Sequence, residues 1–287
     1  MDIHAEPEWE SLYDELACRR GTALFLGMTD TGKSTLVRYL LKRFVTEGIK
    51  VSLVDSDIGQ SSLGLPGTVS MRVFRDKKDL EEFRWKKMSF LGTVNPAKAM
   101  TGVIRAAEMM TCLCREKADM VLVDTTGLVT GAIGRALKTG KIRALNPEYA
   151  IAVQKKDELE HILSRLDDHR IVRLRNSPEA KARSRAVRFR YRNRKLAEYF
   201  AGRPSSVFSL HMNEVRFLYH DKPFSPGEAY IKEKMIIGLN HNEVTLALGI
   251  VEKSQLGRIT FMSRLASLKK INTVVLGDMF LQKIPEG

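Results

Sequence analysis

A phosphate-binding motif lies near the start of the chain, in the segment Gly27-Met-Thr-Asp-Thr-Gly-Lys-Ser34, which fits G-x-x-x-x-G-K-[ST]. An apolar run precedes it and apolar residues at helical spacing follow it, so the motif joins a buried strand to a helix. Its backbone N–H groups would point at phosphate oxygens, at the positive end of that helix. We therefore expect the chain to bind a nucleoside triphosphate through Gly27, Thr29, Asp30, Thr31, Gly32, Lys33, Ser34 and Thr35.

Two side chains of this motif have chemical roles of their own. Lys33 is expected to reach the β- and γ-phosphates, and the Ser34 hydroxyl to ligate Mg²⁺. A second site follows the apolar run 51–54, where Asp55 and Asp57 occupy alternate positions and so point to the same side of a strand end. One carboxylate could hold the metal and the other could take a proton from an attacking hydroxyl. The expected metal ligands are Ser34, Asp57 and Asp55, and the alternative is a turn with capping aspartates.

Positive charge is concentrated in one stretch of the chain. The net charge is +13, and residues 170–203 contain twelve arginines and lysines but only two glutamates, Glu179 and Glu198. A solvated helix usually mixes both signs, because neighbouring like charges repel. This stretch therefore favours binding to a polyanion, which can be nucleic acid, nucleotide phosphates or both, over a merely solubilising surface.

The pattern of apolar runs predicts three parts. Residues 1–20 form a short helix with Trp9, Leu12, Tyr13 and Leu16 on one side. Residues 21–204 alternate strands (23–26, 51–54, 120–123 and 149–153) with helices, which is typical of an α/β fold with a mostly parallel sheet flanked by helices. This part ends in an arginine-rich helix at about 178–200 and a Gly202-Arg-Pro204 stop. Residues 205–287 show short strands between turns, which indicates a small C-terminal β domain.

Composition excludes several classes of protein. The chain is 44% hydrophobic and has no apolar run of the ~20 residues that a membrane span needs. Its first ten residues are acidic, unlike a signal peptide, so we expect a cytoplasmic protein without a membrane partner. Three cysteines make a disulfide framework unfavourable. Cys112 and Cys114 lack the further ligands of a metal site and are expected to pack on a helix.

A GTPase is the second interpretation. Asp124-Thr-Thr-Gly127 fits D-x-x-G, and Gln154-Lys-Lys-Asp157 resembles the guanine-reading N-K-x-D, but with Gln in place of Asn. This interpretation leaves the acidic strand end and the arginine helix without a role. A third interpretation, a non-catalytic ATP-binding adaptor in RNA processing, predicts damage to the phosphate loop, the acid or the arginines. All three are intact.

Taken in order, these motifs resemble those of the P-loop polynucleotide 5′-hydroxyl kinases, the Clp and Grc type of RNA-processing kinases, in their compact prokaryotic form. The resemblance covers about residues 21–204. It rests on the phosphate loop, on Asp57-Ile-Gly-Gln60 with Leu65-Pro-Gly-Thr68, on Phe90-Leu-Gly-Thr-Val-Asn-Pro96, on the clasp segment Asp124-Thr-Thr-Gly-Leu-Val-Thr-Gly131, and on a lid of Arg183, Arg188 and Arg192.

The resemblance implies transfer of the γ-phosphate of ATP, or of another nucleoside triphosphate, to the 5′-hydroxyl of RNA or DNA with Mg²⁺. It implies catalytic roles for Lys33, Asp57, Arg188, Arg192 and Arg183. Gln60, Thr125, Gly127 and Leu128 are then expected near the acceptor strand. Leu128 stands where the clasp commonly has a tryptophan, which removes a base-stacking ring from that position.

Overall fold

A computed structural model of the chain describes residues 5–164, 166–177, 180, 182–201 and 205–282. Five parallel strands form one end of the sheet. In spatial order they are β7 (Ile171–Arg175), β6 (Tyr149–Gln154), β1 (Gly21–Leu26), β5 (Met120–Thr125) and β2 (Val51–Ser56). Two antiparallel strands, β3 (Thr68–Phe74) and β4 (Lys87–Phe90), continue the sheet beyond β2. The predicted α/β architecture is confirmed, and the parallel strands bring their carboxyl ends to one edge.

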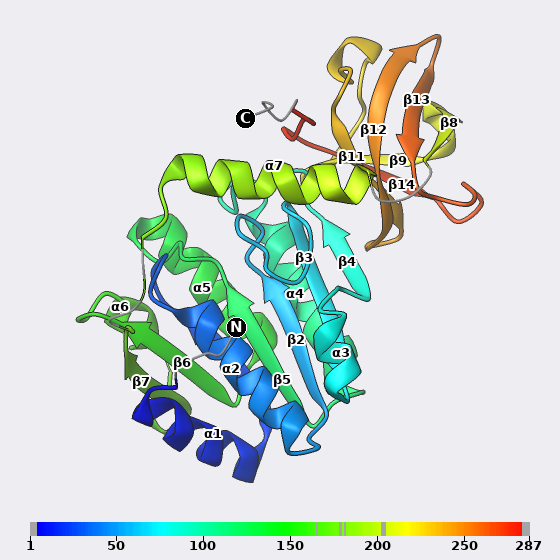
Figure 1. The fold of residues 1–287 in the computed structure, drawn as a ribbon. Helices are drawn as coiled ribbons and strands as arrows, with labels where there is room; N and C mark the ends of the chain where they lie inside the picture. Colours follow the sequence, from blue (N-terminus) through cyan, green and yellow to red (C-terminus); the bar gives the residue numbers. More distant parts are fainter. Residues whose placement is uncertain (1–4, 165, 178–179, 181, 202–204, 283–287) are drawn as a thin grey trace.

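Helices cover both faces of this sheet (Figure 1). The helices α1 (Pro7–Arg19) and α2 (Lys33–Thr46) lie on one face, and α4 (Met100–Arg115) and α5 (Gly131–Leu145) on the other. Two short helices, α3 (Lys77–Glu81) and α6 (Glu160–Leu163), complete this region, with a 3₁₀ turn at Asp168–Arg170. Within the described residues, no helix is long and apolar enough to cross a membrane.

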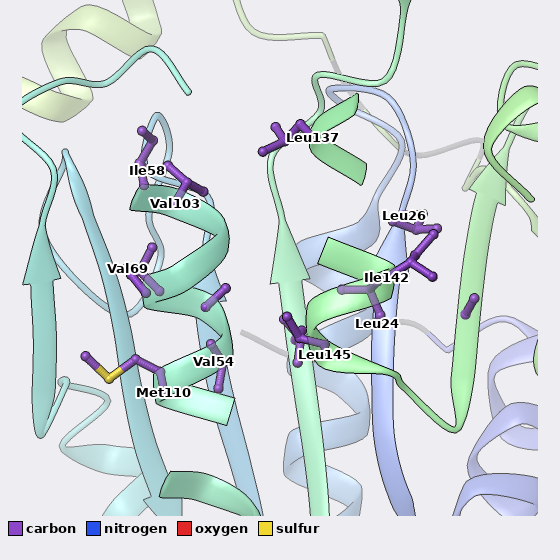
Figure 2. Close-up of a cluster of buried hydrophobic side chains, with 14 of the residues drawn as sticks. Leu24, Leu26, Val54, Ile58, Val69, Val103, Met110, Leu137, Ile142 and Leu145 are labelled. Carbon is purple, nitrogen blue, oxygen red and sulfur yellow. The ribbon is translucent and has the colours of Figure 1, made fainter. Parts of the chain in front are cut away.

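The alternation of side chains along β1 explains the two-faced core. Leu24 and Leu26 pack toward α4 and α5, as Figure 2 shows, whereas Ala23 and Phe25 pack toward α1 and α2. Successive side chains of a strand point to opposite faces, so a strand covered on both sides is apolar throughout. On the α1 side, Trp9, Leu12, Tyr13 and Leu16 are all buried, as the sequence predicts.

The arginine-rich helix is α7 (Arg185–Ala201), which crosses over the carboxyl edge of the sheet (Figure 1). Ser184 precedes its first turn and accepts a hydrogen bond from the backbone N–H of Val187 at 3.3 Å, as a capping residue does. The helix starts later than the predicted residue 178. The predicted positions 178, 179 and 181, and the stop at 202–204, lie outside the described residues.

The C-terminal region is rich in strands, as predicted. They are β8 (Ser206–His211), β9 (Arg216–Tyr219), β10 (Lys222–Phe224), β11 (Ile236–His241), β12 (Val244–Gln255), β13 (Arg258–Ser263) and β14 (Thr273–Leu276), with 3₁₀ turns at Met212–Glu214 and Glu228–Tyr230. All its pairs are antiparallel except β14 with β9. The pairing of Thr245 in β12 with Met88 in β4 joins this region to the central sheet. The whole sheet is therefore mixed: its five parallel strands lie at one end, β3 and β4 follow them, and the C-terminal strands lie at the other end.

An apolar cluster attaches the C-terminal half of α7 to this second region. Leu196 and Tyr199 of α7 pack with Phe90 of β4 and with Ile236 and Leu248 of the C-terminal strands. The Tyr199 hydroxyl also accepts a hydrogen bond from the backbone N–H of Leu248 at 3.1 Å. The end of α7 is thus held by the C-terminal strands, while its first turns lie over the phosphate loop.

Candidate active site

A cavity of about 590 Å³ lies at the carboxyl edge of the sheet, between the phosphate loop and α7. It brings together residues that the sequence analysis expected at one site, although they come from four separate segments. Its lining comprises residues 29–35 of the phosphate loop, Arg38, Asp57, Gln60, Ser62, Gly127, Ala180, Arg183 and Tyr191. Ligands of doubly wound sheets bind at this edge.

The phosphate loop has the conformation that its glycines permit. Gly32 has φ +88°, in the left-handed region that favours glycine, and α2 begins directly after it. Lys33 is buried and its Nζ donates a hydrogen bond to the Met28 carbonyl at 2.7 Å. Burial lowers the pKa of Lys33, and the nearby Asp124, Asp57 and Asp30 oppose that shift. A phosphate anion would therefore meet an amine that is already held over the loop.

Asp124, at the end of β5, is a carboxylate in direct contact with Ser34, one of the expected metal ligands. Ser34 Oγ donates a hydrogen bond to Asp124 Oδ2 at 2.6 Å, and Asp124 Oδ1 is buried without a hydrogen-bond partner among the described residues. Burial, with the neighbouring Asp55 second, raises the pKa of Asp124 to about 6. A hydroxyl beside an unsatisfied carboxylate oxygen fits Mg²⁺, which prefers oxygen ligands.

The sequence analysis did not assign Asp124 to the metal. It considered this aspartate as part of a GTPase-like D-x-x-G and as part of the clasp. The sequence contained a pattern that could have indicated a role for Asp124. An aspartate follows the apolar run 120–123 directly, as Asp55 follows the run 51–54. The strands β5 and β2 are parallel neighbours, with Asp124 in register with Asp55. Of the two, only Asp124 contacts Ser34.

The Asp55 carboxylate forms hydrogen bonds with the loop that follows β2. It is fully buried and accepts hydrogen bonds from the backbone N–H groups of Asp57, Ser62 and Leu63 and from the Ser61 hydroxyl, at 2.6 to 3.1 Å. These bonds fold the loop that follows β2. Such saturation does not support the expectation that Asp55 ligates the metal. Its geometry matches the alternative, a turn organised by an aspartate.

Asp57 remains a candidate base. Its Oδ1 accepts hydrogen bonds from the backbone N–H groups of Gly59 and Gln60, both at 3.0 Å, and the residue lines the cavity. Asp57 Oδ2 has no hydrogen-bond partner among the described residues. The turn therefore fixes the carboxylate through one oxygen and leaves the other for a substrate proton.

Two buried lysines of α5 lie behind these carboxylates. Lys141 Nζ donates to Ser56 Oγ at 2.7 Å, and Ser56 Oγ donates to the Asp124 carbonyl at 2.7 Å. Lys138 Nζ donates to Thr125 Oγ1 at 2.6 Å. Burial lowers the pKa of Lys141 to about 8, against the opposing effect of Asp57, and lowers the pKa of Lys138 strongly. Lys141 is thus linked through Ser56 to the ends of β2 and β5, and Lys138 is bonded to the end of β5.

The sequence analysis did not predict Lys138 and Lys141 as site residues, because a lysine on an amphipathic helix normally faces solvent. Thr125, which was expected near the acceptor strand, is only 1% exposed. Its hydroxyl also donates to the Phe25 carbonyl at 2.7 Å. These contacts place Thr125 within the strand end, and its role near the acceptor strand stays a prediction.

The lid residues contact the phosphate loop directly. Arg188 pairs with Asp30 at 2.6 Å, and the backbone N–H of Arg183 donates to the same carboxylate at 3.0 Å. Arg192, one turn further along α7, is partly buried; burial and Arg188 lower its pKa, and Asp57 acts in the opposite direction. Of the three lid arginines, Arg183 lines the cavity and Arg188 pairs with Asp30 of the phosphate loop, whereas Arg192 lies close enough to Arg188 and Asp57 for their charges to affect its pKa.

Two residues of α7 hold the loop after β2. Tyr191 Oη donates to the Ser61 carbonyl at 2.9 Å, and Lys195 Nζ donates to the carbonyls of Ser61, Ser62 and Gly64 at 2.8 to 3.0 Å. Burial lowers the pKa of Lys195 to about 8. The lid helix and the loop that carries Asp57 are thus one connected unit.

The remaining predicted positions have different surroundings. Gly127 lies against the phosphate loop, where a Cβ would come within 2.2 Å of Thr29 Oγ1, so only glycine allows this approach. Leu128 is partly buried and packs against the core on the α4 and α5 side. Gln154 donates to Glu160 at 2.8 Å and accepts from the Leu159 N–H at 3.2 Å. Its amide is therefore occupied and does not support the guanine-reading interpretation.

The phosphate loop between β1 and α2, with strand-end aspartates beside it, defines a P-loop protein of the α/β class. Residues 27–202 match the family described as the mRNA cleavage and polyadenylation factor CLP1 P-loop. The chain belongs to this family.

Individual relatives agree with that placement. The polyribonucleotide 5′-hydroxyl-kinase of Pyrococcus horikoshii is 32% identical over 226 residues, which are 75% of this chain and 60% of the relative. That of Methanocaldococcus jannaschii is 32% identical over 213 residues, 72% of this chain and 58% of the relative. The chain thus spans about three fifths of the length of these relatives. A solved Clp1p–Pcf11p complex matches in fold, with a TM-score of 0.77 at 12% identity over 98% of this chain and 80% of that one.

Proposed function

We propose that this protein is an ATP-dependent polynucleotide 5′-hydroxyl kinase, which transfers the γ-phosphate of ATP to the 5′-hydroxyl end of RNA or DNA. The observation that carries the proposal is the convergence on one cavity of the phosphate loop, Asp57 and the lid arginine Arg183. The names of the archaeal relatives support the same activity.

ATP would lie along the phosphate loop, with its β- and γ-phosphates near Lys33. The loop's N–H groups and the start of α2 favour the negative charge. Ser34 and Asp124 would hold Mg²⁺, which supplies positive charge to the phosphate oxygens when bound. In this proposal Asp124 takes the place of Asp55 among the expected metal ligands. Asp57 stays among them, since it lies close enough to Asp124 to raise the pKa of that carboxyl.

The acceptor hydroxyl would lie between Asp57 and the γ-phosphate. Asp57 takes the proton of the 5′-hydroxyl as its oxygen bonds to phosphorus, and ADP leaves with the electron pair of the broken bond. Lys33, Arg188 and Arg192 neutralise the charge that spreads over the transferred group. For Arg188 this requires exchange of its Asp30 partner for a phosphate oxygen. Its Nε, buried without a partner among the described residues, offers a further donor.

One experiment tests the proposal. The purified protein is incubated with γ-labelled ATP, Mg²⁺ and 5′-hydroxyl oligonucleotides of RNA and of DNA. Label on the 5′ ends is the expected result, and Asp57→Asn should abolish it while nucleotide binding remains. Fast GTP hydrolysis without label on any oligonucleotide would instead support a GTPase. Nucleotide binding without transfer or hydrolysis would indicate the adaptor.

A further inference from the structure

A basic and aromatic segment leads from α3 into β4, with the sequence Phe83-Arg-Trp-Lys-Lys87. Its cations Arg84 and Lys86 are exposed, and its rings Phe83 and Trp85 are half-buried. The active site does not account for this composition, since the segment does not line the active-site cavity. Exposed cations beside partly exposed rings are typical of surfaces that bind single-stranded nucleic acid, because phosphates meet the cations and bases stack on the rings.

A buried arginine holds this segment in place. Arg72 of β3 is only 1% exposed, and its Nη1 donates a hydrogen bond to the Arg84 carbonyl at 3.0 Å. Its Nη2 forms ion pairs with Asp79 and, at 3.0 Å, with Glu82, which also lies 3.7 Å from Lys86 Nζ. A buried charge needs such partners. The backbone of the segment is therefore fixed, and two neighbouring carboxylates are already paired with Arg72.

The segment is continuous with the active-site cavity. Arg38, which lines the cavity, lies with its guanidinium over the Phe83 ring, 4.9 Å from the ring centre. The Arg84 guanidinium lies over the Trp85 ring, also 4.9 Å from its centre, and that ring is 6.2 Å from the ring of Tyr199 in α7. Cations and rings thus form one row that leads from the cavity to the C-terminal half of α7.

We propose that residues 83–87 bind the acceptor strand beyond the nucleotides held in the cavity. The inference rests on the proposed function. The 5′ end of an acceptor must enter the cavity, so the rest of the strand has to leave it, and the row of cations and rings begins at the cavity wall. Arg84 and Lys86 would meet phosphates, and Trp85 would stack on a base. Such contacts read no sequence and favour a single strand, because the bases of a duplex are already stacked on their neighbours.

The first test measures how transfer depends on the length of the acceptor. With the wild-type protein, the KM for a 5′-hydroxyl strand of about twelve nucleotides should be at least about tenfold lower than the KM for a dinucleotide, because stacked bases and phosphate contacts add affinity. In Arg84→Gln this difference should shrink, and in the double variant Arg84→Gln/Trp85→Leu it should be lost. The KM for the dinucleotide, the KM for ATP and kcat should all stay within about twofold. The melting temperature of each variant shows whether it is folded.

Tryptophan fluorescence gives a second test, which needs no transfer. The chain has two tryptophans, and Trp9 is only 4% exposed, so in a Trp9→Phe variant the signal comes from Trp85. The strand of about twelve nucleotides should quench this fluorescence without ATP, and added salt should weaken the quenching. The dinucleotide should leave the fluorescence unchanged.

Lys117→Gln is the matched control. Lys117 is exposed between α4 and the start of β5, at the edge of the sheet opposite to the cavity, and its replacement removes the same charge as Arg84→Gln. This variant should behave as the wild type. Equal losses in Lys117→Gln and Arg84→Gln would show that only the net charge of the protein matters, and would overturn the surface.

Three further results would overturn the surface and leave the kinase intact: equal KM values for the short and the long strand with the wild-type protein, an unchanged length dependence in the double variant, or no quenching of Trp85. Quenching by polyglutamate and not by the strand would assign the segment to an acidic protein partner instead. No transfer to any acceptor would overturn the proposed function, whereas quenching by the long strand would still support the surface.

Discussion

Among single residues, the carboxylates of the site differ in what already surrounds them. Asp55 is saturated by N–H and O–H donors of the following loop, whereas Asp124 keeps one buried oxygen unpartnered beside Ser34. A buried acceptor without a partner is costly and indicates a ligand. These contacts support the proposal that Asp55 has a structural role and that Asp124 ligates the metal.

Replacing Asp124 or Asp55 by asparagine distinguishes the proposed metal-binding role from the structural one. In Asp124→Asn the Mg²⁺ concentration for half-maximal transfer should rise at least about tenfold, because a charged ligand is lost. In Asp55→Asn that concentration should stay unchanged. Its free energy of unfolding should fall by about 1–3 kcal/mol, because an NH₂ group would replace an acceptor of N–H donors. A titration of transfer activity with Mg²⁺ measures the half-maximal concentration, and denaturant unfolding measures the free energy of unfolding. If the Asp55→Asn variant were stable and needed more Mg²⁺, Asp55 would be a metal ligand after all.

The buried Lys141 gives a second prediction for a single residue. In Lys141→Met the donor to Ser56 is lost, so the end of β2 that carries Asp57 is less firmly placed. Turnover should fall roughly tenfold to a hundredfold, since small displacements of catalytic groups have effects of this size. The KM for ATP should change little. Arg143→Met, on the exposed side of the same helix, is the control, and equal turnover in both variants would contradict the positioning role.

Among the elements, α7 has contacts of different kinds along its length. Arg188 contacts the phosphate loop, Tyr191 and Lys195 hold the loop after β2, and Tyr199 packs on the C-terminal strands. The exposed Arg194 forms an ion pair with Glu198 and lies over the Tyr191 ring, 6.0 Å from its centre. The arginines of one helix should therefore differ in function according to the face they occupy.

That difference can be measured with alanine variants. Arg188→Ala and Arg192→Ala should lower turnover at saturating substrates by about 10³-fold, because the lost contact is made mainly in the transition state. Arg194→Ala should retain turnover and only weaken oligonucleotide binding, with a shallower dependence on salt. Binding defects of the same kind in all three variants would show that α7 is only a basic surface.

Elements with long apolar runs could be predicted from the sequence. The strands β1, β2, β5 and β6 extend the predicted runs by only one or two residues, because burial on both faces makes them continuously apolar. By contrast, β7 contains Arg173 and Arg175 and was included in the arginine-rich stretch. β4 has only four residues, and the sequence analysis treated its end as part of a motif. Asp124, Lys138 and Lys141 needed the three-dimensional structure, because their roles depend on contacts between distant segments.

For the molecule as a whole, the C-terminal strands are part of the support of the lid. In β12, Leu248 is buried against α7 while Leu246 is 43% exposed. Leu248→Ala should lower the free energy of unfolding by about 2–5 kcal/mol. It should also lower turnover at temperatures where the protein is still folded, although Leu248 does not line the cavity. Leu246→Ala should change neither. Unaltered turnover in a destabilised Leu248→Ala would show that the lid does not depend on this support.

The attachment of α7 at both ends has a reciprocal consequence. If the C-terminal strands favour the arrangement of α7 that grips substrate, then substrate must favour the docking of those strands by the same free energy. Binding at the phosphate loop should therefore slow amide hydrogen exchange in β11 and β12, far from any bound phosphate. The C-terminal strands would then report on occupancy of a site they never touch.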